Sequence, residues 1–379
     1  MRVGIDAVTP GAVLEDGAGG MRPMMINLVT SLSELATGAD FVLFENPQVP
    51  LPELAGLPHL TRVACPGVPS GRLLRVLYQN SIYPSVLKRY KLDVFLATCN
   101  VLPLMAPSPA VVIVQSLQFF NHEPVFGRFR GAYLRWAVRA SLRAADAVIA
   151  VSSTAREDTA RLTGIPKKKI HVVQHGLFRS FATPRSIAES PTPDPPYILT
   201  VSTLYRFKNT RRLIEAFALL RHRDHIPHRL RIIGGDADVT AAELRKVAEA
   251  LDVSDHVDFL GAVPHDELPA HYSQAAVFVY PSLYETFGLP PLEAMAVGCP
   301  VVAANASAIP EVVGQAAELV DPMDAEAIRR GIARVLFDTR RRSELIESGR
   351  QWVKRFTWQR AAQETMEILS AVRASRGRP

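Results

Sequence analysis

The sequence predicts an α/β protein built from two doubly wound parallel-sheet domains. Short apolar runs that suit buried strands alternate with longer amphipathic stretches along the whole chain. A segment rich in Pro, Ser and Thr and without periodicity, residues 185–196, interrupts this alternation near the middle. The length of 379 residues suits two or three domains, and 48% hydrophobic residues can fill their cores. We therefore expect an N-terminal domain over 1–184, a linker over 185–196 and a C-terminal domain over 197–356.

The strands of both sheets are expected at the apolar runs. Before the linker these runs are residues 2–6, 41–44, 94–97, 111–114, 147–151 and 170–173. After the linker they are residues 197–201, 230–234, 257–260, 277–280 and 301–303. Strands that are buried on both faces, as in parallel sheets, have such continuous apolar sequences. Ligands of doubly wound domains bind at the carboxyl ends of the strands, so functional residues are expected in the loops that follow them.

Residues 280–311 are the most informative part of the chain. They hold two glutamates eight positions apart, Glu285 and Glu293, around a turn that contains Gly288. A strand precedes this turn, and Pro290-Pro291 can open a helix after it. A loop at a helix N-terminus suits phosphate, which a carboxylate would repel. The two glutamates are therefore expected to accept hydrogen bonds from hydroxyls of a sugar and of a ribose. The alternative is a solvated loop glutamate and an ordinary first-turn helix glutamate.

This pattern resembles the E-x7-E signature of the retaining glycosyltransferases of family 4, and the resemblance runs in order over nearly the whole chain. It implies a GT-B fold, in which two Rossmann-like doubly wound domains face each other across a cleft. It implies that Glu293 holds the nucleotide ribose and that Glu285 lies against the transferred sugar near its anomeric carbon. The donor-binding turn would comprise Thr286, Phe287, Gly288 and Leu289, with the backbone of the last three meeting sugar hydroxyls and phosphate.

The resemblance also implies that the last helix returns to the first domain. The residues around Phe356 and Trp358 fit this crossover, with 359–373 as the returning helix, so residues 357–379 are assigned to the N-terminal domain.

Cations for a diphosphate follow the first strand of the second domain, where Arg206 and Lys208 precede a helix expected from Thr210. Arg can grip phosphate as a fork and Lys as a point charge. On the resemblance both are catalytic residues, because negative charge grows on the leaving diphosphate. Many family members carry Gly-Arg where this chain has Ser202-Thr203, which count as donor-binding residues here. Lys208 fits the second cation of the family, whereas Arg206 must replace the missing arginine. A basic surface loop is the alternative.

The first domain offers an acceptor or phosphate loop. Adjacent glycines at Gly19 and Gly20, followed by Arg22 and a helix expected near Pro23, allow a ligand to approach the backbone. A flexible turn is the alternative. Many family members have a His-Asp pair after the fourth strand, but this chain has Gln115 at the matching place. Glutamine can bond a hydroxyl but accepts no proton at neutral pH, so the replacement is expected to shift substrate preference without excluding activity.

The excess positive charge lies in the first half of the chain. Residues 1–185 contain 20 Lys and Arg against 12 Asp and Glu, concentrated in 72–91 and 128–143. Arg residues recur in 128–143 at near-helical spacing among aromatic residues, a pattern that can lie on anionic lipid. The alternative is a helix packed by its aromatic side with a solvated arginine face. No nucleic-acid-binding motif accompanies the charge.

Several other classes of protein are disfavoured. Cys65, Cys99 and Cys299 are far apart, which supports neither a disulfide framework nor a zinc site. The Gly-Gly loop is not the G-x-G-x-x-G of nicotinamide-binding proteins. Asp236-Ala237-Asp238 is a D-x-D, but GT-B enzymes do not bind metal this way, so no cofactor and no metal are expected. Since neither a signal peptide nor a membrane span is visible, we expect a cytoplasmic protein, with a peripheral place on the inner face of the membrane as the variant of this expectation.

The resulting hypothesis is a metal-independent retaining hexosyltransferase. It would transfer a hexose, first of all mannose from GDP-mannose, to a glycan or a polyprenyl-linked glycan during synthesis of cell-surface polysaccharide or lipopolysaccharide. Three alternatives stay open: a UDP-hexose or deoxyhexose donor, a UDP-N-acetylglucosamine epimerase of the same fold, and a non-catalytic protein that binds sugar nucleotides.

Overall fold

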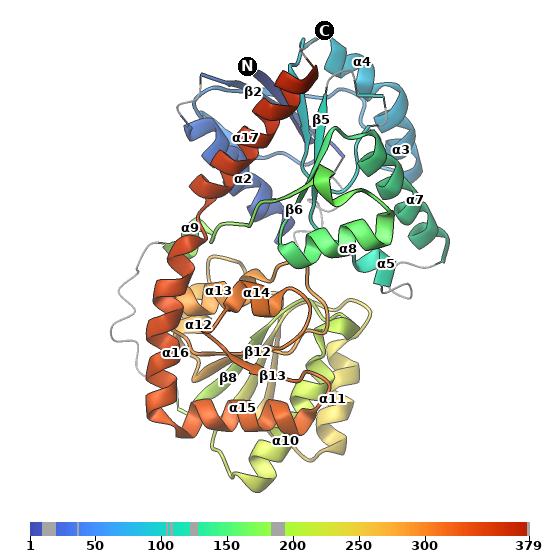
Figure 1. Cartoon of the computed structure of the whole chain (residues 1–379). Helices are drawn as coiled ribbons and strands as arrows, with labels where there is room; N and C mark the ends of the chain where they lie inside the picture. Colours follow the sequence, from blue (N-terminus) through green and yellow to red (C-terminus); the bar gives the residue numbers. More distant parts are fainter. Residues whose placement is uncertain are drawn as a thin grey trace. The chain divides into compact units, whose positions relative to one another are not determined.

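The chain divides into two compact units in the computed structural model, which describes residues 1–9, 20–35, 38–103, 105–106, 109–121, 128–182 and 194–376. One unit is Met1–Gly176 with Thr357–Pro379, and the other is Leu177–Phe356 (Figure 1). The first unit therefore ends at Gly176, before the expected boundary at 184, and the short helix α9 (Arg179–Ala182) belongs to the second unit. Most of the expected linker, 185–193, lies outside the described residues.

The first unit contains a seven-stranded parallel sheet in the order β3-β2-β1-β4-β5-β6-β7. Its strands are β1 (Arg2–Ala7), β2 (Asp40–Glu45), β3 (Leu60–Ala64), β4 (Val94–Ala97), β5 (Ala110–Val114), β6 (Ala147–Ala150) and β7 (Ile170–Val172). Its helices are α2 (Met21–Glu34), α3 (Arg72–Ser81), α4 (Tyr83–Lys88), α5 (Gln118–Asn121), α7 (Arg128–Ala144), α8 (Ser153–Thr163) and α17 (Trp358–Arg376). The order changes direction between β1 and β4, as in doubly wound sheets.

The second unit contains a six-stranded parallel sheet in the order β10-β9-β8-β11-β12-β13. Its strands are β8 (Tyr197–Val201), β9 (Arg229–Ile233), β10 (Val257–Gly261), β11 (Val277–Tyr280), β12 (Val301–Ala304) and β13 (Glu318–Val320). Besides α9, its helices are α10 (Thr210–Arg223), α11 (Ala241–Ala250), α12 (Leu268–Gln274), α13 (Leu289–Ala296), α14 (Ile309–Val313), α15 (Ala325–Phe337) and α16 (Thr339–Trp352). Here the order changes direction between β8 and β11.

Every expected strand is present, and the structure adds one edge strand to each sheet. β3 is the outer strand of the first sheet, and its residues are partly buried or exposed. β13 is the outer strand of the second sheet and has only three residues. Because an edge strand can contact solvent, neither has the continuous apolar sequence that marks the central strands.

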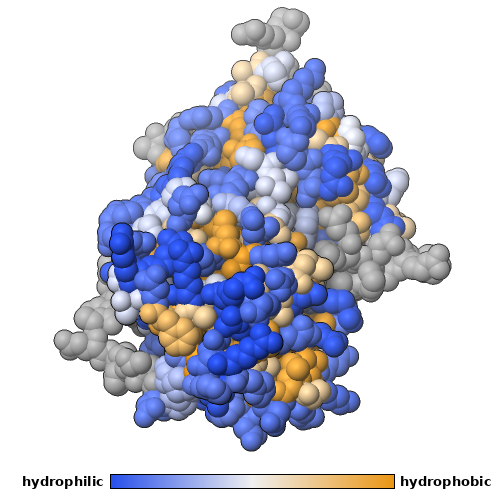
Figure 2. All heavy atoms as spheres, turned by 60° about the horizontal axis from the view of Figure 1, so that its bottom comes forward, coloured by the Kyte–Doolittle hydropathy of each residue, from blue (hydrophilic) through white to orange (hydrophobic). Residues whose placement is uncertain are grey.

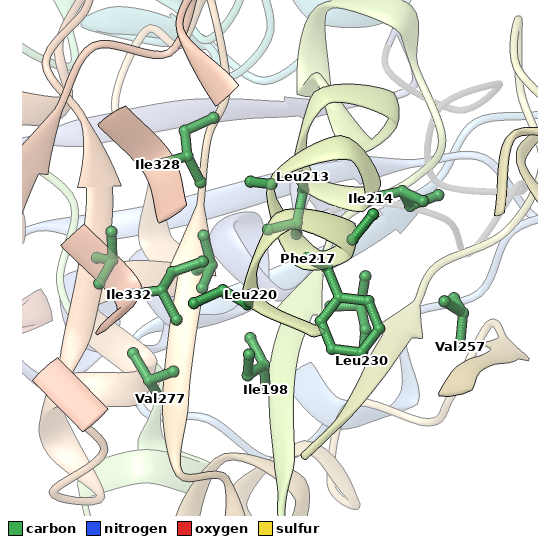
Figure 3. Packing of buried hydrophobic residues seen from close by; sticks show 14 of the residues in the cluster. Ile198, Leu213, Ile214, Phe217, Leu220, Leu230, Val257, Val277, Ile328 and Ile332 are labelled. Atoms are coloured by element: carbon green, nitrogen blue, oxygen red, sulfur yellow. The ribbon is translucent and has the colours of Figure 1, made fainter. Parts of the chain in front are cut away.

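The core of the second unit lies between its sheet and the helices α10 and α15 (Figure 3). Leu213, Phe217 and Leu220 recur at helical spacing on α10, so they lie on one face of that helix. They pack with buried residues of the strands and of α15, among them Ile198, Leu230, Val277, Ile328 and Ile332. Burying one such side chain contributes roughly 1.5–3 kcal/mol, so this cluster stabilises the packing of the two helices on the sheet.

The last helix, α17, packs against α2 of the first unit. At the point where the chain returns to this unit, Gly176 lies against the backbone of Thr357 and Trp358, and a Cβ atom at 176 would overlap it. The ring of His175 lies 5.4 Å from that of Trp358, measured between centroids. The end of the first segment of this unit, at Gly176, is therefore packed against the start of its second segment, at Thr357.

Some large apolar side chains are exposed on each unit, among them Met323 and Phe337 of the second. The face shown in Figure 2 is mostly hydrophilic, with hydrophobic side chains in separate patches. Large exposed apolar side chains of the first unit include Leu74 and Leu77 on α3 and Trp136 on α7, each more than half exposed. Within the described part of the chain, the helices lack the combination of length and hydropathy that a membrane crossing requires.

Candidate functional site

The candidate site lies where the strand order of the second sheet changes direction. β8 and β11 are neighbours there, and the loops that follow them leave the sheet at the same edge. Such a switch point leaves a crevice outside the carboxyl ends of the strands. The loop after β8 carries Arg206 and Lys208, and the loop after β11 carries Glu285.

Lys208 and Glu285 form an ion pair at this edge. The Lys208 ammonium donates to Glu285 Oε1 over 2.6 Å, and the two side chains are only 13% and 9% exposed. The hydroxyl of Tyr280, the last residue of β11, donates to the same oxygen over 2.6 Å. The ammonium also lies 3.2 Å from the Tyr280 hydroxyl oxygen. One carboxylate oxygen thus receives both donors, and Oε2 accepts no hydrogen bond from the described residues.

Lys208 is positioned by a 3-10 turn, Arg206–Lys208, directly before α10. Asn209 follows in the left-handed conformation with φ 63°, which asparagine tolerates better than most residues. Its buried amide donates to the carbonyl oxygens of Pro281 and Pro322 over 3.1 and 2.7 Å. The turn is therefore tied to the loop that carries Glu285.

Arg206 is exposed, and its backbone rather than its side chain is tied down. Its N–H donates to Asp238 Oδ1 over 2.8 Å, while Asp236 Oδ1 accepts the N–H of Ala241 over 2.8 Å. The D-x-D segment therefore bonds the backbone of two neighbouring elements. One is the turn Arg206–Lys208, called the cation loop below, and the other is the start of α11. In the described part of the chain, no three or more His, Cys, Asp and Glu side chains are grouped so as to hold a metal.

Ser202 and Thr203 lie between β8 and this turn and are partly exposed. The Ser202 N–H donates to the carbonyl of Ile233 over 2.9 Å, which extends the β8–β9 pairing. Gly234 comes directly after Ile233 in the chain and has φ 153°. A Cβ atom at this position would overlap the Ser202 carbonyl oxygen. The path of the backbone at Ser202 therefore requires a glycine directly after the neighbouring strand β9.

The turn after Glu285 leads into α13. The Ser307 hydroxyl donates to the Glu285 carbonyl over 2.6 Å and accepts the Glu285 N–H over 3.2 Å. Gly288 is the N-cap of α13 with φ 104°, a conformation that favours glycine. The side chains of Phe287 and Leu289 are buried and that of Thr286 is partly exposed, so the first two can offer a ligand mainly their backbone.

Glu293 lies on α13 and is 3% exposed. Its Oε2 accepts the hydroxyl of the fully buried Tyr272 over 2.8 Å, and His265 Nε2 lies 3.4 Å from Oε1. The ring of His265 contacts Phe178 and Phe181 edge-on, at centroid distances of 4.9 and 5.5 Å. The carboxylate is therefore ordered and mostly screened from solvent.

The expected first-unit residues have internal partners where they are described. Gly19 lies outside the described residues, and Gly20 is the exposed N-cap of α2. Arg22 forms an ion pair with Glu53 over 3.0 Å, so its guanidinium is already engaged. The buried Gln115 donates through Nε2 to the carbonyl of Thr98 over 3.2 Å, and its backbone N–H donates to Asn100 Oδ1 over 2.8 Å.

Sequence reasoning missed the residues that hold these groups in place. Tyr272, Tyr280 and Ser307 each bond one of the two glutamates, and Asp238 bonds the cation loop. Tyr280 had a usable signal, because it is the final residue of a strand that leads directly into the glutamate loop. Tyr272 lies on α12 and becomes a neighbour of Glu293 only through tertiary packing.

Two family models match the chain, one on each side of residue 180. The model described as Glycosyltransferase Family 4 matches residues 18–178, and the model described as Glycosyl transferases group 1 matches residues 183–352. Together they leave only the ends of the chain and a few central residues unmatched.

The chain is also similar to curated mannosyltransferases. It is 32% identical over 264 residues to O-antigen chain mannosyltransferase B of Escherichia coli, which covers 68% of this chain and 69% of the relative. It is 34% identical over 194 residues to the GDP-mannose-dependent alpha-(1-6)-phosphatidylinositol monomannoside mannosyltransferase of Mycolicibacterium smegmatis, 48% of this chain and 50% of that relative.

Solved structures share the fold over the full length. Sucrose-phosphate synthase from Thermosynechococcus elongatus superposes with a TM-score of 0.78 at 23% identity, covering 99% of this chain and 100% of that chain. Anabaena Alr3699/HepE in complex with UDP and glucose superposes with a TM-score of 0.74 at 20% identity, covering 98% and 100%. With the two parallel sheets and the family matches, these findings identify the chain as a glycosyltransferase of the family 4 type, mannosyltransferase-like and with the GT-B fold.

Proposed function

We propose that this glycosyltransferase is a retaining hexosyltransferase that uses a nucleoside-diphosphate sugar. GDP-mannose is the first candidate for this donor. The observation that carries the proposal is the buried pair of Lys208 and Glu285 at the switch point of the second sheet, 2.6 Å apart. A cation and a carboxylate together at the carboxyl ends of β8 and β11 suit a donor that presents both a diphosphate and sugar hydroxyls.

The cations act on the leaving group. Breaking the bond between the anomeric carbon and the diphosphate adds negative charge to the phosphate oxygens, so a fixed cation stabilises the transition state more than the bound donor. Lys208 is held in place by its turn and by Glu285, which makes it the fixed cation. Arg206, with an exposed side chain in the same turn, supplies a second cation to the diphosphate.

The glutamates act on hydroxyls. Oε2 of Glu285 accepts no bond from the described residues and is free to accept a hydroxyl of the transferred sugar. Glu293 accepts a ribose hydroxyl. The backbone N–H groups around Gly288, with Thr286, Phe287 and Leu289, bind sugar and phosphate, and Ser202 and Thr203 line the other side of the donor.

Retention of configuration fits the residues that are present. Gln115 cannot take a proton at neutral pH, and the acceptor proton can pass instead to the leaving phosphate oxygen on the same face of the sugar. The acceptor hydroxyl then attacks from the face that the diphosphate leaves. We further propose that neither a metal nor another cofactor takes part, since Lys208 and Arg206 supply the positive charge.

The acceptor is proposed to be a glycan or a lipid-linked glycan of cell-surface polysaccharide or lipopolysaccharide. The names of the relatives support this, since one is an O-antigen chain mannosyltransferase and the other a phosphatidylinositol monomannoside mannosyltransferase. A lipid-linked acceptor would bring the protein to the inner face of the membrane through the basic first unit. On α7 the rings of Tyr133 and Trp136 are exposed rather than packed inside, with centroids 6.2 Å apart.

A donor panel tests the proposal. The protein is incubated with GDP-mannose, UDP-glucose, UDP-N-acetylglucosamine and a deoxyhexose nucleotide, and release of the nucleoside diphosphate is measured with and without an acceptor extract. We expect release from GDP-mannose to be fastest. Faster release from another donor replaces mannose in the proposal, epimerised UDP-N-acetylglucosamine supports the epimerase, and binding without turnover supports a non-catalytic protein.

Stereochemistry and metal dependence are read from the same reaction. NMR of the product should show the anomeric configuration of the donor, and activity should persist in EDTA. An inverted product would end the proposal of retention. Activity that EDTA abolishes and manganese restores would end the proposal of metal independence and turn attention to Asp236 and Asp238.

A further inference from the structure

Two fully buried tyrosines of the second unit each bond one glutamate of the E-x7-E pair. The Tyr280 hydroxyl donates to Glu285 Oε1 over 2.6 Å, and the Tyr272 hydroxyl donates to Glu293 Oε2 over 2.8 Å. The two rings come from different elements, the end of β11 and the helix α12. Tyr197, which is also fully buried, instead donates to the backbone carbonyl of His271 over 2.7 Å.

We infer that Tyr280 and Tyr272 are positioning residues with separate tasks, Tyr280 setting the geometry of the reacting centre and Tyr272 setting the affinity for the nucleotide. The inference rests on the proposed function, since it assigns Glu285 to the transferred sugar and Glu293 to the ribose. It goes further in predicting which kinetic constant depends on which hydroxyl.

Tyr280 controls two groups at once. Its hydroxyl and the Lys208 ammonium share Glu285 Oε1, which orients the carboxylate so that Oε2 is left for the substrate. The ammonium also lies 5.4 Å from the centroid of the Tyr280 ring and 5.4 Å from that of Phe207. Without the hydroxyl, the ammonium and the carboxylate can shift together, and the cation loses its fixed position under the leaving group.

Tyr272 controls the carboxylate of Glu293 alone. It occupies Oε2, so Oε1 is the oxygen that a ribose hydroxyl can reach, with His265 Nε2 3.4 Å away. Tyr272 packs against Phe278 and Phe181 at centroid distances of 5.0 and 5.8 Å, which fixes the ring. Without the Tyr272 hydroxyl, the Glu293 carboxylate can rotate. It is then no longer held in the orientation that binds the ribose.

Both hydroxyls stay protonated over the working pH range. Burial, followed by the neighbouring carboxylate, raises the pKa of Tyr280 and of Tyr272 well above the ordinary value. Each tyrosine therefore remains a donor to a glutamate and does not act as a base.

The test compares Tyr280→Phe, Tyr272→Phe and Tyr197→Phe, with Tyr197→Phe as the matched control of a buried tyrosine that lies outside the glutamate pair. Donor hydrolysis and transfer are measured with GDP-mannose and with UDP-glucose, and thermal melting verifies folding. We expect Tyr280→Phe to lower kcat about tenfold with the donor KM within about twofold of wild type. Tyr272→Phe should raise the donor KM about tenfold with kcat within about twofold, and Tyr197→Phe should leave both constants within about twofold.

The outcomes separate the two proposals. If the wild type turns over its donor but the glutamate-bonded tyrosine variants match Tyr197→Phe, or change the same constant equally, the inference is overturned and the proposed function stands. If the wild type turns over no donor, the proposed function fails before any variant is made, and the inference fails with it. If a phenylalanine variant does not fold, the tyrosine at that position is replaced with 3-fluorotyrosine, which keeps the hydroxyl. The inference then requires a change in the same single constant, kcat for position 280 and the donor KM for position 272.

Discussion

Lys208 and Glu285 are a charged pair whose burial is poorly explained by stability alone. Removing two charges from water costs several kcal/mol per ion, and a buried pair often only offsets that cost. The side chains are 13% and 9% exposed, and Oε1 receives two donors while Oε2 receives none from the described residues. A pair with an unused acceptor at the switch point of a sheet is better explained by a ligand than by folding.

The first prediction concerns the coupling within this pair. Lys208→Met should cost roughly 3 kcal/mol in the free energy of unfolding, because it leaves a buried carboxylate without its cation. Lys208→Met with Glu285→Gln should cost less than the sum of the single variants, by roughly 1–3 kcal/mol. Urea denaturation of the four proteins measures this. Additive costs would mean that the two side chains do not interact in solution.

The same variants test the catalytic assignment. In folded Lys208→Met, kcat should fall more than the donor KM rises, since the cation acts mainly on the leaving diphosphate. An unchanged kcat would remove Lys208 from the catalytic residues.

The second prediction concerns Glu293. Glu293→Gln keeps the size of the side chain but removes the charged acceptor, so donor binding should weaken by roughly 1.5–3 kcal/mol. Isothermal titration of GDP-mannose measures the change. Glu344→Gln, at a side chain that is 48% exposed on α16, is the control and should bind as wild type. Equal affinities for all three proteins would rule out the ribose contact.

The third prediction concerns His175 at the end of the first unit. Burial lowers the pKa of His175 to about 4, from 6.5. The folded protein therefore keeps the ring neutral while the unfolded chain protonates it below pH 6.5. The contribution of this neutral ring to the free energy of unfolding is fully present above pH 6.5. It falls as the pH drops toward 4, by roughly 2 kcal/mol between pH 7.5 and pH 5. In His175→Asn this part of the pH dependence should be absent from urea denaturation curves, and an unchanged slope would contradict the prediction.

At the scale of elements, the central strands follow from the sequence. Val277–Tyr280 and Val94–Ala97 are apolar throughout and occupy central positions, so hydrophobic pattern alone gives their bounds. The edge strands Leu60–Ala64 and Glu318–Val320 lack that pattern, because only part of each is buried. Their pairing is decided by the neighbouring strand rather than by their own residues.

The candidate site was predictable in its charged residues but not in their supports. Glu285 and Lys208 lie in loops after strands, where topology brings them together from 77 positions apart. Tyr272, by contrast, reaches Glu293 from another helix, and Asp238 serves the cation loop from a segment that by sequence resembles a metal motif. Such contacts depend on how elements pack, which no local pattern encodes.

The fourth prediction concerns the loops after β8 and β9. In Gly234→Ala the new Cβ would overlap the Ser202 carbonyl, and φ 153° is unsuited to alanine. We expect a loss of roughly 1–3 kcal/mol in the free energy of unfolding from the strained backbone, together with weaker donor binding. Gly235→Ala is the matched control, because its Cβ would meet only Ala262, at 3.9 Å. Indistinguishable melting of the two variants would contradict this account.

At the scale of the whole molecule, the two units have different surfaces. The pair of glutamates and both cations of the proposed donor site belong to the second unit. The surplus of basic residues and the exposed apolar side chains of α3 and α7 belong to the first. This division suits an enzyme whose second unit binds a soluble nucleotide sugar while its first unit approaches the acceptor.

The fifth prediction is that the first unit binds anionic bilayers. Arg128, Arg130 and Arg135 lie on α7 with Trp136, and each Lys or Arg near an anionic surface contributes on the order of 1 kcal/mol, screened by salt. Arg135 also donates to the carbonyl of Phe119 over 3.4 Å, so its loss removes a contact between α7 and α5. Replacing the three arginines with Gln should reduce co-sedimentation with phosphatidylglycerol vesicles at low salt, while donor binding stays unchanged.

The control for this prediction removes the same charge from the second unit. Arg211, Arg330 and Arg340 have side chains that are 73%, 58% and 89% exposed, and their replacement with Gln should leave vesicle binding at the wild-type level. If both triple variants lose binding equally, the attraction depends on net charge rather than on α7. If the wild type does not bind anionic vesicles even at low ionic strength, the arginines of α7 are a solvated face. The acceptor is then better sought among soluble glycans, because a lipid-linked acceptor requires the enzyme to reach the bilayer.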